Sequence, residues 1–416
     1  MLTNKISAVA AVATIALAPS VVAFATGPAQ AQQSDVITMG AAVSLTGKYA
    51  SSGQDTKDGY DITVKKLNDA GGVTVGGKKY KLEVKYYDDE STPARAAQLA
   101  ERLIQQDGIK YILGPYGSGL SKAMAPITEK YKVPMIQGNG AARELFQNGW
   151  KYMFATLTTA DQYVSPSVEL LAEQFKKAGK DPSAAKIVMA FENDPFSLDV
   201  RTGIEELTKK YNMKVLVDDK LPPEINDMAA TLTKAKALKP DLLIVSGHEK
   251  GAALVVRQTA EMKVDVPMIA TSHCDTAQIT EKQPKISDYV LCASQWDRSL
   301  KFSDKLFGSA EDFAKLFEKD YKRAPSYQVA ESAAAVMVFA DAFSRAKDLT
   351  PDSVRDAIAA TDIKTFYGPI KFDATGQNAG KKMIMFQVQN GQYKVVYPAE
   401  VANAQIVYPV PSWSKR

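Results

Sequence analysis

Residues 36–72 read VITMGAAVSLTGKYASSGQDTKDGYDITVKKLNDAGG. The run over residues 36–43 is apolar or small and predicts a strand that is buried on both faces. A polar loop over residues 44–53 follows, and the apolar spacing after it predicts a helix over residues 54–70 that a pair of glycines ends. This order of strand, polar loop and helix is typical of a parallel sheet covered by helices.

The same alternation continues along the chain and forms two series. The first predicts strands at 80–87, 110–113 and 133–136 with helices at 93–107 and 120–131. The second predicts strands at 186–190, 214–217, 242–246, 267–270 and 289–293 with helices at 165–177, 198–211, 228–238 and 250–262. Helices return at 311–322, 327–346 and 352–360, before strands at 368–373, 382–388 and 393–397. The pattern predicts the α/β class, with two doubly wound open-sheet lobes and more than one crossover between them.

The first 31 residues are typical of an export signal. Lys5 supplies the positive charge, residues 6–18 form the apolar region, and small residues allow cleavage after Ala25 or Ala31. No cysteine follows either cleavage site, so we expect a protein that is not lipid-anchored and that works in the periplasm. Because ATP and reduced nicotinamides are scarce there, we expect ligand binding rather than cofactor chemistry.

Composition and charge exclude several classes of partner. The chain is 45% hydrophobic and 24% charged, with a net charge of +4 and without a Lys/Arg block of the nucleic-acid-binding kind. The longest strongly apolar run of the expected mature chain, residues 333–340, is far shorter than the roughly 20 residues that cross a bilayer. We therefore expect a folded protein without a nucleic-acid partner and without membrane insertion.

Cys274 and Cys292 are the only cysteines. In an oxidising compartment they predict one disulfide, which would contribute about 3 kcal/mol by closing a loop of this length. Residues 272–275 read Ser-His-Cys-Asp and could also supply zinc ligands. Because no second motif with zinc-ligand spacing accompanies them, we expect neither a metal nor a cofactor.

Two glycine-rich loops follow neighbouring predicted strands. Residues 114–119 read GPYGSG and open directly into a helix, with Ser118 at its start, and residues 137–142 read QGNGAA. Glycine lets a ligand approach the backbone closely, and the free N–H groups of a helix start attract an anion such as a carboxylate. Since ligands of open α/β sheets bind at the carboxyl ends of the strands, these loops predict the binding site.

The order and spacing of several motifs resemble those of the leucine/isoleucine/valine-binding protein family. They are Ser44 to Gly47, Asp58-Gly59, Asn68 to Gly72, Asp88-Asp89, the Ser118 and Asn139 loops, and Tyr367 to Asp373. The resemblance implies a type I solute receptor of an ABC importer, in which two lobes joined by a three-strand hinge close like a Venus flytrap. It implies a permease as partner, and we expect a monomer.

The predicted lobes follow from this resemblance and the two series. One lobe comprises residues 35–158 with 296–366, and the other comprises residues 159–295 with 367–400. Residues 401–416 are expected to form a C-terminal tail.

The resemblance also implies ligand-binding residues. Ser118 and the loop at Asn139, Gly140 and Ala141 would hold the carboxylate and the amine. Phe196 would cover the ligand side chain, and His248 stands in place of a further aromatic residue. Ser272 or His273 falls where an acidic partner for the ammonium belongs. The complete predicted set is Ser52, Tyr116, Ser118, Asn139, Gly140, Ala141, Phe196, His248, Ser272 and His273.

The missing acidic partner leaves two ligand classes open. A buried ammonium without a carboxylate loses several kcal/mol, unless Glu249 or Asp275 substitutes. The ligand is therefore expected to be a hydrophobic or branched-chain amino acid, or an amine-free acid such as an aromatic or 2-oxo carboxylate. The absence of a Gly-x-Ser-x-Gly motif argues against an enzyme. A sensory ligand-binding protein is the remaining alternative.

Overall fold

The computed structural model describes residues 35–223 and 225–416. The predicted signal peptide, with its cleavage after Ala25 or Ala31, lies outside the described residues. Within the described ranges, no helix combines the length and the apolar character that a membrane crossing requires.

The first sheet has six strands in the order β2-β3-β1-β4-β5-β6. They are β1 (Asp35–Val43), β2 (Val73–Val75), β3 (Lys78–Asp88), β4 (Ile112–Leu113), β5 (Met135–Gln137) and β6 (Met153–Ala155). All neighbouring strands are parallel except β2, which is antiparallel to β3. The second half of β1 is buried because helices cover both faces of the sheet.

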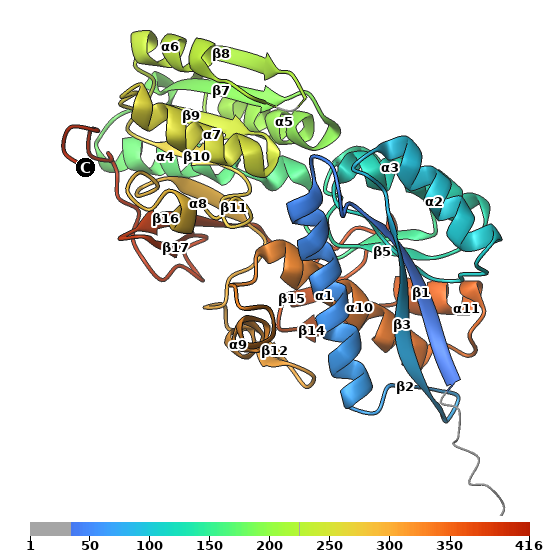
Figure 1. Ribbon diagram of the computed structural model, residues 1–416. Coiled ribbons are helices and arrows are strands. Elements are labelled where there is room, and N and C mark those ends of the chain that lie inside the picture. Colours follow the sequence, from blue (N-terminus) through green and yellow to red (C-terminus); the bar gives the residue numbers. More distant parts are fainter. Residues whose placement is uncertain (1–34, 224) are drawn as a thin grey trace, which may run out of the picture. The chain divides into compact units, whose positions relative to one another are not determined.

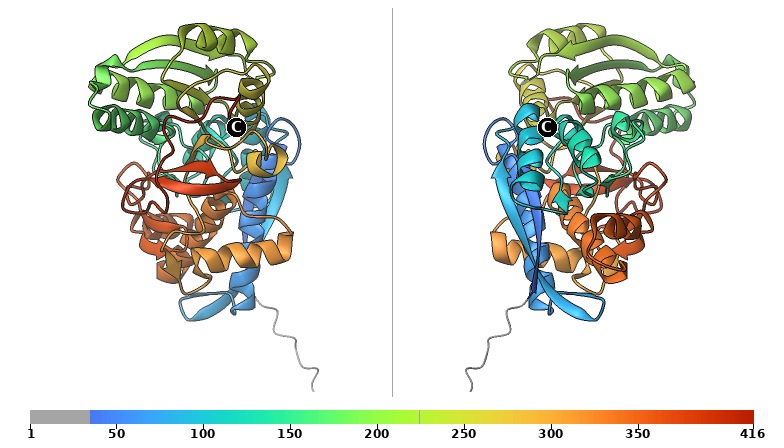
Figure 2. Two further views of the ribbon diagram at one scale, coloured as in Figure 1. Left: turned by 90° about the vertical axis from the view of Figure 1, so that its left-hand side faces the viewer. Right: turned by 90° about the vertical axis from the view of Figure 1, so that its right-hand side faces the viewer.

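Helices from distant parts of the sequence cover this sheet (Figure 1). They are α1 (Ala50–Asp69), α2 (Pro93–Gln105), α3 (Ser118–Lys130), α10 (Tyr327–Arg345) and α11 (Pro351–Ala359). α9 (Ala310–Tyr321) lies beside α1, where the hydroxyl of Tyr321 donates to the carbonyl of Asp58. α1 packs against α10, and α2 packs against α3. Figure 2 shows orange helices of the C-terminal half next to the blue α1, in agreement with the packing of α10 on α1. This sheet and its helices are called the first lobe below.

The second sheet has seven strands in the order β17-β16-β11-β10-β9-β7-β8. They are β7 (Lys186–Glu192), β8 (Lys214–Leu221), β9 (Leu242–Ser246), β10 (Ile269–Thr271), β11 (Leu291–Ser294), β16 (Ile384–Gln389) and β17 (Gln392–Tyr397). Its helices are α4 (Pro166–Lys177), α5 (Pro195–Lys210), α6 (Ala229–Leu238), α7 (His248–Glu261) and α8 (Ile279–Lys282). β16 is antiparallel to both of its neighbours, β11 and β17. The remaining pairs, β11–β10, β10–β9, β9–β7 and β7–β8, are parallel. This sheet and its helices form the second lobe, so two open sheets are present as predicted.

Three segments cross between the lobes and are bonded to one another. Nε2 of Gln295 donates to Oγ1 of Thr158 at 2.8 Å, and Nδ2 of Asn378 donates to the carbonyl of Thr156 at 2.8 Å. The strand β14 (Asp362–Thr365) pairs with β15 (Gly368–Lys371), and Ala155 pairs with Gln377. The predicted lobe boundary between residues 366 and 367 therefore falls inside a hairpin, and the third crossing comes after Gln377.

Several elements of two to four residues were not predicted, because so few residues carry no periodic signal. They are β2, β6, β14, α8, the pair β12 (Ser303–Asp304) and β13 (Gly308–Ser309), and the 3-10 turns η1 (Arg143–Phe146), η2 (Ala160–Gln162) and η3 (Pro182–Ala184). The expected tail, residues 401–416, packs on the second sheet: the N–H of Val410 donates to the carbonyl of Pro267, and the N–H of Val407 donates to Gln387.

Candidate functional site

Side chains from both lobes enclose a small cavity at the carboxyl ends of the strands. Its ten lining residues are Tyr116, Gly117, Asn139, Tyr163, Phe196, His248, His273, Tyr327, Gln328 and Glu331. The cavity volume is about 10 Å³, which leaves room for about one water molecule. A larger molecule can therefore enter only when the lobes separate or the lining side chains turn.

The backbone around the cavity exposes helix starts. α3 begins after Gly117 and α7 begins after Gly247, and neither helix has a side chain that caps its N-terminus. Gly117 adopts a φ of 82°, which glycine tolerates and other residues disfavour. Two uncapped helix starts, one from each lobe, place partial positive charge at the cavity and favour an anion.

The two histidines that follow β9 and β10 have left-handed backbones. φ is 35° at His248 and 59° at His273. Holding a residue other than glycine in the left-handed region of φ and ψ costs about 1 to 3 kcal/mol of folding free energy, and residues strained in this way cluster at ligand sites. The backbone geometry agrees with a binding role for both histidines, the only two in the chain.

The hydroxyl of Tyr116 links the two imidazoles. Its oxygen lies 3.0 Å from Nδ1 of His248 and 3.1 Å from Nε2 of His273, and Ser52 also bonds to it. Burial, helped by the nearby His248, holds the pKa of His273 well below its ordinary value, so this ring is neutral. Its Nε2 accepts the Tyr116 proton, and its own proton therefore resides on Nδ1. Nδ1 has no hydrogen-bond partner among the described residues, so a buried donor is left at the cavity.

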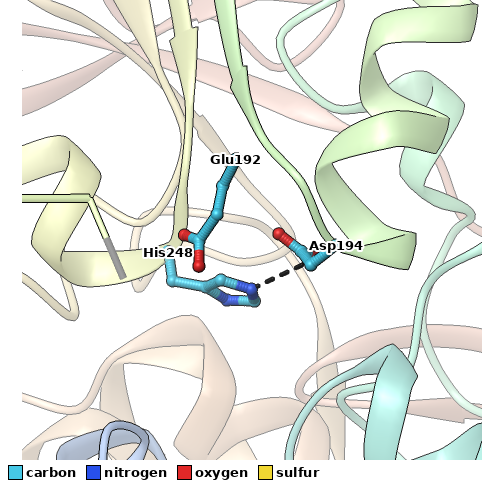
Figure 3. A group of neighbouring side chains, drawn as sticks. All are labelled: Glu192, Asp194 and His248. Atoms are coloured by element: carbon cyan, nitrogen blue, oxygen red, sulfur yellow. Dashed lines mark ion pairs between the residues drawn. The ribbon is translucent and has the colours of Figure 1, made fainter. Parts of the chain in front are cut away.

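His248 lies between two carboxylates of the second lobe (Figure 3). Its Nε2 is 3.4 Å from Oδ1 of Asp194, an ion-pair distance without the alignment of a hydrogen bond. Burial opposes the charged imidazole, but the attraction of Asp194, aided by Glu192, outweighs it and raises the pKa of His248. Burial likewise opposes the charge of Asp194, and His248 outweighs it and lowers the pKa of that carboxyl. Below its raised pKa, His248 is therefore an imidazolium that is paired with Asp194 and lies next to an uncapped helix start.

The same three residues could in principle hold a metal ion. Potential ligand atoms of Glu192, Asp194 and His248 lie within 4.8 Å of one another. Oδ1 of Asp194, however, already accepts the N–H groups of Phe196 and Ser197 as the N-cap of α5. The cluster is therefore accounted for as a charge pair that fixes the protonation of His248.

Aromatic rings form the walls of the cavity. The ring of Phe196 lies 5.0 Å from that of Tyr163 and 5.2 Å from that of His273, measured between centroids. Tyr327 lies 6.2 Å from His273 and 6.4 Å from Tyr163. Tyr49 does not line the cavity, but its ring lies 4.9 Å from that of His248. Such walls suit a flat or apolar ligand body.

The structure brings five of the ten predicted ligand residues to the cavity. They are Tyr116, Asn139, Phe196, His248 and His273. The other five are Ser52, Ser118, Gly140, Ala141 and Ser272, and none of these lines it. The hydroxyl of Ser272, for example, lies 3.3 Å from that of Ser246 and is fully buried. The N–H of Gly140 donates to the side chain of Gln137.

Ser118 holds the neighbouring loop. Its Oγ accepts the N–H groups of Ala141 at 3.1 Å and of Ala142 at 3.0 Å. Replacing Ser118 by alanine leaves two buried donors unpaired and is expected to lower the free energy of unfolding by about 1 to 3 kcal/mol. Denaturant unfolding measures this loss, with Ser118→Thr as the variant that keeps the hydroxyl. An unchanged stability together with weaker ligand binding would instead assign Ser118 a direct contact with ligand.

Five lining residues are absent from the predicted set. Gly117 belongs to the predicted glycine-rich loop, and sequence reasoning missed the other four. Tyr163 lies in the crossing segment after η2 and gives no periodic signal, whereas Tyr327, Gln328 and Glu331 lie in the first turns of α10. The signal that could have found them is the pair of polar residues three positions apart in an otherwise apolar helix. Glu331 is 1% exposed, although it is ionisable.

The two acids that the sequence offered as ammonium partners lie elsewhere. Neither Glu249 nor Asp275 lines the cavity. Asp275 accepts the N–H of Tyr327 at 3.0 Å, which ties the lobes together, and burial raises its pKa to about 7. It borders a wider groove of about 920 Å³ that opens to solvent beside Asp55 and Arg323. Its larger volume and its many charged lining residues distinguish this groove from the aromatic cavity.

Further bonds hold the lobes together around the site. Arg143 of the first lobe donates from Nε to Asp199 of the second at 2.8 Å, and its N–H donates to the same carboxylate at 2.8 Å. Oγ1 of Thr276 donates to Oε1 of Gln328 at 2.6 Å. The described conformation is therefore closed, with the cavity shielded from solvent.

The fold and this interlobe site define a solute-binding protein of the two-lobed, periplasmic type. The profile of the family described as "Periplasmic binding protein" matches residues 36–392. The chain belongs to this family. Members of the family are solute-binding proteins rather than enzymes.

Similar proteins include both amino-acid and aromatic-acid binders. "Leu/Ile/Val-binding protein homolog 7" of Brucella suis is 25% identical over 404 residues, which is 94% of this chain and 98% of the relative. LivJ of Streptococcus pneumoniae in complex with isoleucine has a TM-score of 0.76 at 22% identity, over 90% of this chain and 100% of that one. A solute-binding protein of Rhodopseudomonas palustris BisB5 in complex with 3,4-dihydroxybenzoic acid has a TM-score of 0.75 at 20% identity, over 92% of this chain and 100% of that one.

Proposed function

We propose that this protein is the substrate-binding component of an ABC importer and that it captures a small carboxylate between its lobes. The observation that carries the proposal is the placement of His248 and of the unpartnered Nδ1 of His273 at the cavity, beside two uncapped helix starts. The raised pKa of His248 adds a positive charge in neutral to acidic solution. An anion is the ligand that this combination of donors favours. After export and removal of the signal peptide, the monomer would deliver its ligand to a membrane permease.

The cavity favours an amine-free acid over an α-amino acid. Its one carboxyl, Glu331, has a pKa held well above the ordinary value by burial, with Lys381 opposing the shift, so it is uncharged at neutral pH. An ammonium group would need this carboxyl to ionise, or would have to compete with His248 for the carboxylate of Asp194, and either costs binding energy. The 3,4-dihydroxybenzoic acid complex shows that the fold accommodates aromatic acids, and the isoleucine complex shows that it also accommodates amino acids.

Closure of the lobes would both capture the ligand and mark the loaded protein for the permease. Tyr116 of the first lobe bonds to His248 and His273 of the second, so a ligand held between them stabilises the closed form by its contacts with both lobes. The hinge would be the three crossing segments that contain Thr158, Gln295 and Asn378. A permease can then distinguish the closed form from the open one.

A thermal-shift panel on the mature protein tests the proposal. A ligand at 100 times its dissociation constant adds about 2.7 kcal/mol to the native state. The panel sets leucine, isoleucine, valine and phenylalanine against 4-hydroxybenzoate, coumarate and 2-oxo acids. We expect stabilisation by amine-free acids. Stabilisation by amino acids alone would mean that a carboxylate of the site ionises to hold the ammonium, and stabilisation by neither group would reject the proposed ligand class.

A further inference from the structure

Glu331 is a buried acid at the cavity that carboxylate capture does not use. It lies in the apolar part of α10, where Val329, Ala330 and the residues from Ser332 to Val336 are also buried. Burying an ionisable group without a charge partner or a hydrogen bond is costly, and such a group persists where it has a task. A leucine at this position would pack into the same helix face without that cost.

The surroundings of Glu331 provide few hydrogen bonds. The hydroxyl of Tyr367 donates to Oε2 at 3.4 Å, a long contact that it also makes with Oε1 of Gln295. Behind Tyr367, Nζ of Lys381 donates to the Tyr367 carbonyl at 2.7 Å and lies 4.0 Å from its ring centroid. Within the described residues, no ion pair of 4.0 Å or less joins Lys381 to Glu331. The carboxyl therefore retains capacity for a further hydrogen bond on its cavity side.

Glu331 and the histidines line the same cavity but belong to separate hydrogen-bond networks, called its two ends here. The histidine end is tied together by the hydroxyl of Tyr116. At the other end, Gln295 bonds both to the hydroxyl of Tyr163 at 2.8 Å and to Tyr367, which contacts Glu331. Ring contacts connect the two networks, because Tyr163 contacts Phe196 and Tyr327, and both of these contact His273.

Building on the proposed function, we propose that Glu331 determines specificity by hydrogen bonding to a hydroxyl or amino group at the end of the ligand opposite its carboxylate. A ligand with its carboxylate at His248 and His273 would place its body between the rings and its far end against Glu331. An acid with a polar far end satisfies the carboxyl, whereas an acid with an apolar far end leaves it unpaired. Leucine, whose amine and carboxylate share one carbon, also leaves it unpaired.

Paired probes test this assignment by isothermal titration calorimetry. 4-Hydroxybenzoate is compared with benzoate, and 4-hydroxycinnamate with cinnamate, so that two ligand lengths are covered. For the wild type we expect the hydroxylated acid of at least one pair to bind about tenfold tighter or better. Glu331→Leu should remove this preference, and Glu331→Gln, which keeps a donor and an acceptor, should retain part of it. Thermal unfolding of both variants checks that they fold.

The outcomes separate this inference from the proposed function. If the unsubstituted acids bind as tightly as their hydroxylated partners, or if Glu331→Leu keeps the preference, the role of Glu331 is overturned while carboxylate binding stands. Tight binding of leucine alone overturns it as well. If no acid or amino acid binds, the proposed function itself fails.

Discussion

Replacing His248 by asparagine is expected to weaken carboxylate binding by about 10- to 100-fold. Hydrogen bonds to charged groups contribute about 1.5 to 3 kcal/mol, and the variant removes the cation of the site together with its bond to Tyr116. Asparagine suits the test because it tolerates the left-handed backbone at this position, where φ is 35°. Calorimetric titration with the best ligand of the thermal-shift panel measures the loss. An affinity within about twofold of the wild type would remove His248 from the binding site.

The pH dependence of binding provides a second test with a matched variant. Because the pKa of His248 is raised, its imidazolium form is present below the ordinary imidazole pKa of about 6.5 and persists somewhat above it. The affinity for a carboxylate should therefore fall as the pH rises through this raised pKa. Asp194→Asn removes the charge that raises this pKa, while asparagine remains a good N-cap for α5. In this variant burial should lower the pKa of His248, so that tight binding returns only in more acidic solution. A profile identical to the wild type would contradict the role of Asp194.

The sequence predicts the two sheets because long runs of alternating strand and helix leave few other arrangements. Pro, Gly and apolar spacing also place most helices within a few residues of their observed ends, as for α10, predicted at 327–346 and observed at Tyr327–Arg345. Sequence-based prediction fails for elements that are too short to show a periodic pattern. The pairing of β14 with β15, which moves the third crossing beyond Gln377, depends on contacts between short segments rather than on their composition.

The residues that line the cavity are only half predictable for a related reason. Spacing places a residue at a strand end but does not decide which of two neighbours faces the cavity. At the end of β10, His273 lines the cavity whereas Ser272 turns to Ser246. Ser118 is at the predicted helix start, yet its hydroxyl accepts from the 141–142 backbone. Glu331 was not predicted because α10 is far in sequence from the two glycine-rich loops and reaches the cavity only through tertiary packing.

Removing the disulfide between Cys274 and Cys292 is expected to lower the free energy of unfolding by about 3 kcal/mol. The bond closes a loop with a sequence separation of 18 and joins segments at β10 and β11 that are buried in the second lobe. Without it, the unfolded chain gains the conformational freedom of that loop. Denaturant unfolding of the Cys274→Ala/Cys292→Ala double variant measures the effect, and thermal unfolding should shift down by several degrees.

The wild type under reducing conditions is the matched control, because alanine also removes two buried sulfur atoms. If the reduced wild type loses as much stability as the double variant, the covalent bond is the cause; if it loses little, the loss comes from packing. Cys274 of this disulfide directly follows His273 in the sequence. The hydroxyl of Tyr393 also donates to the carbonyl of Cys274 at 2.9 Å. This second contact should keep the strand end in place, so ligand affinity at low temperature is expected to change less than about threefold. A much larger loss of affinity would mean that the disulfide positions the imidazole of His273 as well as stabilising the lobe.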